Sequence, residues 1–220
     1  MSNLNQLILS FDHEQNFKNL DFYVSKSNAH VFNLISSWRT TNEKFLNISG
    51  EKFCGKSHLI NIFLEKNKGL KMNSDELSND CLKKINFYKN IVIEDITSSI
   101  NEQLFYSLIN IVEAENKSLI VTSDVSIVEM NFKLTDLKSR SKNFTLTSIE
   151  NPDDDLIFAL VLKNLSDRQI SIDKKLIDYI IKRIDRSYSN ISDFIYTIDQ
   201  LSLKKKKSID FKIIKEALGD

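Results

Sequence analysis

Glycine and proline are scarce in this chain, which contains four glycines and one proline in 220 residues. Because these two residue types mark turns and loops, their few positions are informative. Gly50 and Gly55 fall within one short loop, and Pro152 follows Asn151 in a dipeptide that is typical of a turn. We therefore expect a loop of defined conformation at residues 50–55 and a domain boundary at Pro152.

Other absences narrow the class of protein. The two cysteines, Cys54 and Cys81, lie too far apart to suggest a disulfide framework or a zinc site. Basic and acidic residues number 30 each, so the chain lacks the basic surplus of a dedicated DNA-binding protein. It has no run of about 20 apolar residues, and its first residues do not resemble a signal peptide. We expect a cytoplasmic protein that neither enters a membrane nor reads a DNA sequence directly.

Short β-type runs alternate with helical stretches before Pro152. The β-type runs cover residues 45–48, 91–93, 119–122 and 144–147, and apolar residues at helical spacing lie between them. This alternation predicts an α/β fold, in which helices flank a parallel sheet. After Pro152 the apolar spacing predicts only helices. We expect an N-terminal tail over 1–20, an α/β nucleotide-binding domain over 21–151 and a small helical lid over 152–220.

The loop that contains two of the glycines has a phosphate-binding pattern. Residues 50–57 read G-E-K-F-C-G-K-S, which matches G-x-x-x-x-G-K-[ST] between a predicted strand and a predicted helix. Backbone N–H groups in such a loop surround phosphates, the lysine contacts the β and γ phosphates, and the serine holds Mg²⁺. We therefore predict that ADP or ATP binds with Mg²⁺ at Gly50, Glu51, Lys52, Phe53, Cys54, Gly55, Lys56, Ser57 and His58, with Cys54 and His58 packing rather than reacting.

Acidic and polar residues follow two later β-type runs. Glu94 and Asp95 come directly after Ile91-Val92-Ile93, a run typical of a strand buried on both faces. In that position Glu94 would hold Mg²⁺, and Asp95 would orient an attacking water molecule. The next run ends in Thr122-Ser123-Asp124, where Ser123 is our candidate sensor of a γ-phosphate. A simple polar turn is the alternative interpretation of that tip.

Asp136-Leu137-Lys138-Ser139-Arg140 resembles the D-L-x-S-R box of the DnaA branch of AAA+ proteins. In that branch the final arginine contacts the nucleotide of a neighbouring subunit, so the resemblance implies that Arg140 is an arginine finger in trans. The order of motifs along the chain is similar to that of Hda-type proteins, which are DnaA-related regulators without the DNA-binding domain. The chain ends after the predicted lid, so we expect no helix-turn-helix domain here.

A second resemblance lies near the N-terminus. Residues 6–11 read Q-L-I-L-S-F and resemble the Q-L-x-L-x-[LF] peptide that docks bacterial proteins on the replicative sliding clamp. Leu9 and Phe11 would fill an apolar pocket, Gln6 would form hydrogen bonds, and Leu7 completes the pattern. An ordinary edge strand is the alternative.

Two positions depart from the family pattern. Phe53 stands where many phosphate loops carry a further glycine, and Ser192 stands where this branch has an arginine in a lid helix. We therefore expect weak intrinsic ATP hydrolysis. The lysine run 204–207 is interpreted as a solvated loop between two helices, with DNA binding as the alternative.

The resemblance implies a regulator that docks on the DNA-loaded sliding clamp and promotes hydrolysis of DnaA-bound ATP, which restrains replication initiation. Two alternatives remain open, an autonomous AAA+ ATPase resembling a helicase loader and a scaffold that has lost nucleotide binding. A homodimer is also possible, and the sequence does not decide between ADP and ATP.

Overall fold

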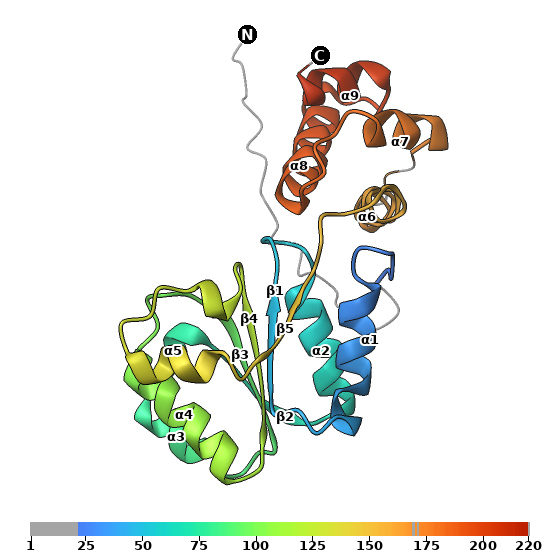
Figure 1. The fold of residues 1–220 in the computed structure, drawn as a ribbon. Helices are drawn as coiled ribbons and strands as arrows, with labels where there is room; N and C mark the ends of the chain where they lie inside the picture. Colours follow the sequence, from blue (N-terminus) through green and yellow to red (C-terminus); the bar gives the residue numbers. More distant parts are fainter. Residues whose placement is uncertain (1–21, 169, 171, 220) are drawn as a thin grey trace.

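The computed structural model describes residues 22–168, 170 and 172–219. Its centre is a five-stranded sheet in the order β2-β3-β4-β1-β5, and all neighbouring strands pair in parallel (Figure 1). The strands are β1 (Phe45–Ser49), β2 (Gly69–Asn73), β3 (Asn90–Ile96), β4 (Ser118–Ser123) and β5 (Thr145–Ser148). The predicted α/β fold with a parallel sheet is therefore confirmed.

Helices cover both faces of this sheet (Figure 1). One face carries α1 (Ala29–Ser37) and α2 (Lys56–Lys66), and the other carries α3 (Asn79–Ile85), α4 (Glu102–Ala114) and α5 (Thr135–Ser141). The β3 strand shows why the apolar runs are continuous. Val92 packs on the α1–α2 face, while Ile91 and Ile93 pack on the opposite face, since successive side chains of a strand alternate.

The remaining helices form a separate helical unit, which we call the lid. It consists of α6 (Asp154–Asp167), α7 (Lys174–Ile181), α8 (Tyr188–Lys205) and α9 (Phe211–Leu218), which share their own apolar core. Each lid helix begins after a capping residue whose side chain accepts a hydrogen bond from a first-turn N–H group; these residues are Asp153, Asp173, Ser187 and Asp210. Short 3-10 turns occupy Trp38–Thr40, Ser74–Glu76 and Ile127–Glu129.

Among the residues that the structure describes, no helix is both long enough and apolar enough to cross a bilayer.

Candidate nucleotide-binding site

The loop at residues 50–55 joins β1 to α2 and has a conformation that needs glycine at two positions. Gly55, which directly precedes α2, has a φ of 101°, in the left-handed region that favours glycine. At Gly50, an added Cβ would lie 2.8 Å from Cys54 Sγ, a separation that real side chains do not tolerate. The Gly50 N–H donates to the carbonyl oxygen of Ser123 at 3.1 Å, which joins the loop to the end of β4.

Phe53 has a left-handed backbone conformation, which glycine adopts more readily. Its φ is 69°, and its side chain is 53% exposed, so the bulky ring points away from the interior of the loop. Lys52 Nζ lies 5.3 Å from the ring centroid. The loop therefore contains a left-handed residue other than glycine, which costs about 1–2 kcal/mol.

Lys56 is buried, and its ammonium group is held by the loop itself. Lys56 Nζ donates to the carbonyl oxygens of Gly50 at 2.6 Å and Glu51 at 3.2 Å, and it pairs with Asp124 Oδ1 at 3.1 Å. Asp124 follows β4, and its side chain is 71% exposed. Asp124 was not predicted as a site residue, although it belongs to the same polar strand tip as Ser123, which was.

Ser123 lies in the interior of the domain. Its hydroxyl donates to the carbonyl oxygen of Val125 at 2.7 Å and lies 2.8 Å from the Asn47 Nδ2 donor. Asn47 Oδ1 in turn accepts from the Ile127 N–H at 2.9 Å. These bonds fix the segment after β4 on β1, so Ser123 positions the loop that carries Asp124.

The two acids at the end of β3 point in different directions. Glu94 is buried, and Glu94 Oε2 pairs at 2.6 Å with Lys71 Nζ from β2. Asp95 is exposed, has a φ of 54°, and lies where the β3–β4 register shifts between Ile93 and Ile96. This irregularity breaks the alternation of the strand and separates the two carboxylates.

Glu94 also provides a test of whether the site suits a cation. Its second carboxylate oxygen, Oε1, is buried and has no hydrogen-bond partner among the described residues. An oxygen of this kind suits Mg²⁺, which usually binds one or two protein groups and relies on nucleotide phosphates for further ligands. The residues therefore fit a nucleotide-bound Mg²⁺.

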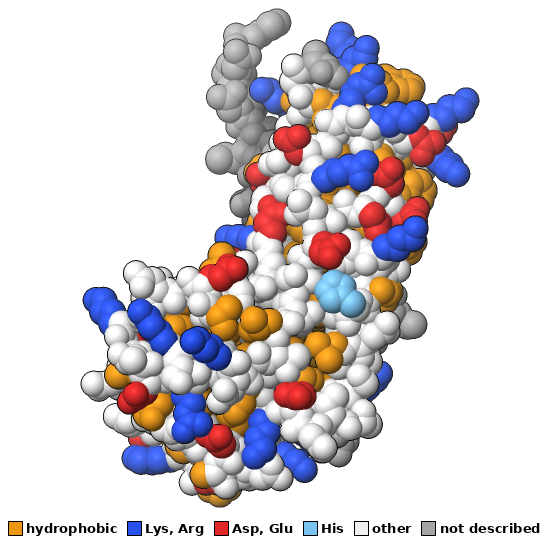
Figure 2. Space-filling model, viewed as in Figure 1, with side chains coloured by type: hydrophobic (Ala, Val, Ile, Leu, Met, Phe, Trp, Pro, Cys, Tyr) orange, Lys and Arg blue, Asp and Glu red, His pale blue; other side chains and the backbone are white. Residues whose placement is uncertain are grey.

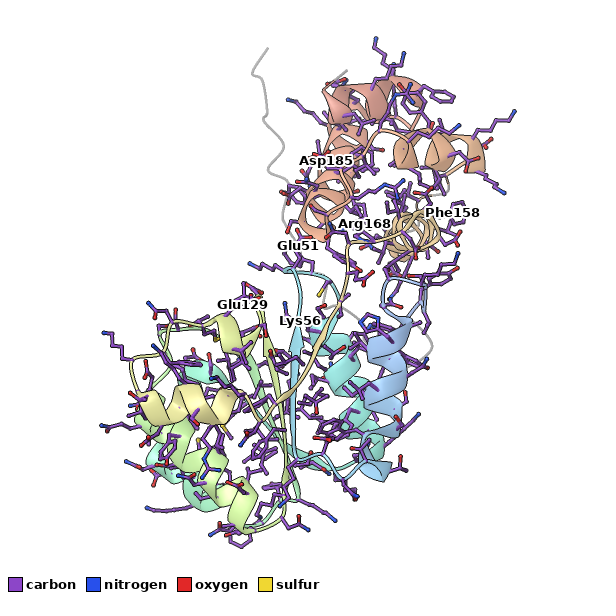
Figure 3. The ribbon with its side chains drawn as sticks, in the orientation of Figure 1. Glu51, Lys56, Glu129, Phe158, Arg168 and Asp185 are labelled. Atoms are coloured by element: carbon purple, nitrogen blue, oxygen red, sulfur yellow. The ribbon has the colours of Figure 1, made fainter. Side chains whose placement is uncertain are left out.

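Glu51 connects the phosphate loop to the lid. Its two carboxylate oxygens accept from the N–H groups of Tyr188 at 2.9 Å and Ser189 at 3.1 Å, at the start of α8. Figure 3 shows Glu51 between the loop and this helix, with Lys56 below it. Partial burial raises the pKa of Glu51, but hydrogen bonds from Ser189, Tyr188 and Ser187 outweigh this effect, so the pKa lies below its ordinary value.

The contact between the phosphate loop and the lid also has an apolar part, which consists of Tyr188 and Cys54. Both are buried in the core that lies beneath α1 and α2, and the Tyr188 hydroxyl donates to the Glu150 carbonyl oxygen at 3.1 Å. Burial raises the pKa of the Cys54 thiol, although the Lys56 charge partly offsets it. Cys54 is thus protonated at neutral pH and fills space, as expected. His58 also packs, with its ring centroid 5.2 Å from that of Phe22.

Arg140 lies on α5, away from its own phosphate loop in the fold (Figure 1). Its guanidinium forms an ion pair with Glu113 near the end of α4, and the Arg140 side chain is 33% exposed. Ser192 is the fifth residue of α8. The two preceding arginines are engaged elsewhere, since Arg186 pairs with Asp154 at 2.7 Å and Arg183 stacks on Tyr179. The predicted clamp-binding residues Gln6, Leu7, Leu9 and Phe11 lie outside the described residues.

Comparison with known sequences identifies DnaA proteins as relatives. No protein-family model matches the chain. The chromosomal replication initiator protein DnaA of Caldanaerobacter subterraneus is 25% identical over 190 residues, which cover 76% of this chain and 43% of that protein. DnaA of Helicobacter hepaticus is 25% identical over 223 residues, which cover 90% of this chain and 49% of that protein. The chain thus spans less than half the length of these relatives.

Solved structures show the same fold. Domain III of the Thermotoga maritima replication initiation protein DnaA superposes with a TM-score of 0.74 at 17% identity, covering 93% of this chain and 96% of that one. AMPPCP-bound DnaA from Aquifex aeolicus gives 0.66 at 17% identity, covering 83% and 65%. The RuvB Holliday junction branch migration motor of Thermotoga maritima gives 0.65 at 14% identity, covering 89% and 69%. Together these matches support a DnaA-like AAA+ domain at low identity, without singling out Hda-type proteins.

Proposed function

We propose that this protein is a DnaA-related AAA+ regulator that promotes hydrolysis of DnaA-bound ATP while it is docked on the DNA-loaded sliding clamp. The position of Arg140 is the observation that carries this proposal. Its helix, α5, lies apart from the chain's own phosphate loop, and one ion pair to Glu113 holds its guanidinium near the surface. An arginine in such a place is better suited to the nucleotide of a neighbouring molecule than to its own.

Arg140 acts through charge. Its planar guanidinium can donate two hydrogen bonds to the oxygens of a phosphoryl group and neutralise charge that develops during transfer. To do so, Arg140 must exchange Glu113 for phosphate. The Glu113 pair keeps the guanidinium oriented until DnaA, the proposed partner, is in place.

The chain's own nucleotide has a different role in this proposal. Lys56 would leave Asp124 and the loop carbonyls to meet the phosphates of ADP or ATP, and Ser57 and Glu94 would hold Mg²⁺. Bound Mg²⁺ would neutralise phosphate charge. Asp95 is exposed at an irregular strand end, and Ser192 offers no guanidinium, so we propose that intrinsic hydrolysis is weak. The nucleotide then fixes a conformation rather than serving as the main substrate.

Clamp docking rests on the sequence resemblance at residues 6–11, which lie outside the described residues. Its test is binding to the sliding clamp of the same organism, with the wild type compared with Gln6→Ala/Leu9→Ala. Loss of binding in the double variant supports docking through this peptide, and unchanged binding contradicts it.

The decisive experiment measures ATP hydrolysis by DnaA in the presence of clamp loaded on DNA. Arg140→Ala should abolish stimulation but keep clamp binding, while Lys138→Ala on the same helix should behave like the wild type. Glu113→Gln keeps the size of the side chain but frees Arg140, so stimulation at limiting protein should rise by up to about fivefold. Full stimulation by Arg140→Ala would refute the proposed role.

An autonomous ATPase resembling a helicase loader is the second candidate, because Lys56, Glu94 and Asp95 are all retained. It predicts turnover without DnaA that is lost in Asp95→Asn, together with ATP-dependent assembly. Turnover that is negligible in the wild type would exclude this candidate.

A further inference from the structure

The far end of the lid combines basic and aromatic side chains that the nucleotide site does not use. Six lysines and a single acid lie between residues 204 and 215, although the whole chain has no net charge. Figure 2 shows Lys and Arg side chains gathered over the upper end of the lid. The charge balance of the chain therefore hides a local basic surplus.

The neighbouring acids do not neutralise this surplus. Asp210 Oδ1 accepts from the Ile213 N–H at 2.9 Å and so caps α9. Glu216 forms an ion pair with Lys205. Lys204, Lys206, Lys207, Lys212 and Lys215 are all exposed, and none forms an ion pair with a carboxylate in the described part of the chain. The run that was expected to be a loop is therefore half helical, since Lys204 and Lys205 end α8, and its exposed lysines form one side of a larger basic surface.

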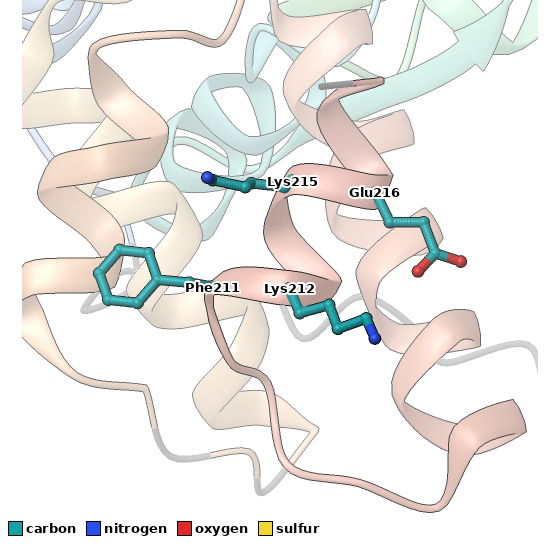
Figure 4. Close-up of a pocket in the computed structure, with 4 residues that line it drawn as sticks. All are labelled: Phe211, Lys212, Lys215 and Glu216. Carbon is teal, nitrogen blue, oxygen red and sulfur yellow. The ribbon is translucent and has the colours of Figure 1, made fainter.

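An aromatic group lies within this surface. On α9, Ile213 and Ile214 are buried, whereas Phe211, the first residue of the helix, is 47% exposed. Figure 4 shows Phe211, Lys212, Lys215 and Glu216 projecting from α9, and they line a hollow of about 510 Å³. The Phe211 ring meets the Tyr179 ring edge to face, with centroids 5.4 Å apart, and Arg183 lies 3.8 Å from the Tyr179 centroid. Phe211 is therefore supported by the lid core and remains accessible.

We propose that this lid-end surface, formed by Lys204, Lys206, Lys207, Phe211, Lys212 and Lys215, binds a single-stranded nucleic acid without sequence preference. Lysines neutralise backbone phosphates, and an exposed aromatic ring stacks on a base. Stacking distinguishes a single strand from a duplex, whose bases already stack on one another. A purely acidic protein segment would use the lysines but gain little from Phe211. The proposal does not depend on Arg140, on the clamp or on a bound nucleotide.

The test measures binding of fluorescent oligothymidine and oligouridine of about 16 nucleotides, together with a duplex of equal length, to the whole protein. The lid variant Lys204→Gln/Lys207→Gln/Lys212→Gln/Lys215→Gln is compared with Lys66→Gln/Lys68→Gln/Lys84→Gln/Lys89→Gln, which removes as many exposed lysines from the α/β domain. Lys206 is retained because it has left-handed backbone geometry at the end of α8. Thermal unfolding verifies that both variants fold.

We expect the lid variant to bind single strands at least tenfold more weakly and the control to bind within twofold of the wild type. The slope of log affinity against log salt should become shallower by about 3, since each lost phosphate contact contributes about 0.7. Phe211→Leu should weaken binding at least fivefold, whereas Phe211→Trp should retain it. The two oligonucleotides distinguish DNA from RNA.

Three results would overturn the proposal. The first is equal weakening of single-strand binding in the two lysine variants, and the second is duplex binding as tight as single-strand binding. The third is displacement of the bound oligonucleotide by polyglutamate as effectively as by oligothymidine at the same concentration of charge. The last result would assign the surface to acidic protein segments.

Discussion

Charged groups at the carboxyl edge of the sheet contrast with those at the far end of the lid. Near the phosphate loop, Lys56 pairs with Asp124, Glu94 with Lys71, and Glu51 with the first amides of α8. At the far end of the lid, Lys204, Lys207 and Lys212 have no such partner in the described part of the chain. In the first region, Lys56 can bind an anionic ligand only by giving up its present partners, whereas the lysines of the second are open to one.

This difference has an energetic consequence. A ligand that displaces an internal ion pair gains only the difference in free energy between the contacts it makes and those it breaks. Affinity at the phosphate loop therefore depends on how far the new contacts of Lys56 exceed the old ones. A ligand at the exposed lysines gains from the release of counterions and should respond strongly to salt. Salt dependence therefore separates the two regions experimentally.

The largest expected effect comes from replacing Lys56, the residue that must exchange its protein partners for phosphate. Lys56→Ala should weaken ADP binding by about a hundredfold, because the phosphates lose their buried cationic partner. Calorimetric titration with ADP and Mg²⁺ measures it, and Lys66→Ala, at an exposed lysine at the end of α2, should remain within twofold of the wild type. Unchanged binding in Lys56→Ala would show that this loop is not the nucleotide site, whereas a wild type that does not bind ADP would favour the scaffold alternative.

A smaller effect is expected where the phosphate loop meets the lid. Glu51→Ala removes the acceptors of the Tyr188 and Ser189 N–H groups, while Ser187 continues to cap α8, so the contact should lose about 1 kcal/mol. Amide hydrogen exchange should then become about fivefold faster at the start of α8 and stay unchanged in β1 and β4.

The charge of Glu51 can be tested separately from its hydrogen bonds. Because its pKa is lowered in the folded protein, the ionised group contributes stability above its ordinary pKa of 4.5, and this contribution disappears as the pH falls through the lowered value. Glu51→Gln should remove this pH dependence while preserving part of the amide protection. Identical pH profiles for wild type and Glu51→Gln would argue that the contact is not electrostatic.

The smallest effect concerns the strained residue of the loop. Phe53→Gly relieves about 1–2 kcal/mol of left-handed strain, but the greater chain entropy of the unfolded state costs about 0.5–1 kcal/mol, so the net stabilisation is about 0–1.5 kcal/mol. Urea unfolding measures it. Phe53→Ala removes the ring and keeps the strain, so it should not stabilise. Equal stabilities for the glycine and alanine variants would show that φ at this position is not strained.

The sequence predicts those features that are local in the chain. The phosphate loop follows from eight consecutive residues, and β3 follows from the apolar run Ile91-Val92-Ile93. β2 was not predicted, because this edge strand has only Leu70 and Met72 as apolar residues and Gly69 at its start.

Contacts between distant residues were much harder to anticipate. Glu51 and Tyr188 lie 137 positions apart, and Lys56 and Asp124 lie 68 positions apart. Nothing in the sequence around Glu51 indicates which distant helix its carboxylate caps. Whether Ser123 or Asp124 faces the phosphate loop depends on which of the two side chains points into the domain at the end of β4. A run of polar residues does not reveal that orientation. The exposure of Phe211 likewise depends on how α9 packs on α8.

The α8 helix begins at the phosphate loop and ends at the lysines. Its first two N–H groups rest on Glu51, and its last residues are Lys204 and Lys205. With 18 residues it is about 27 Å long, so a tilt of about 10° about Glu51 would carry its far end through about 5 Å. The helix thus has the proportions of a mechanical lever, in which a small rotation at its Glu51 end becomes a large displacement where the lysines meet solvent.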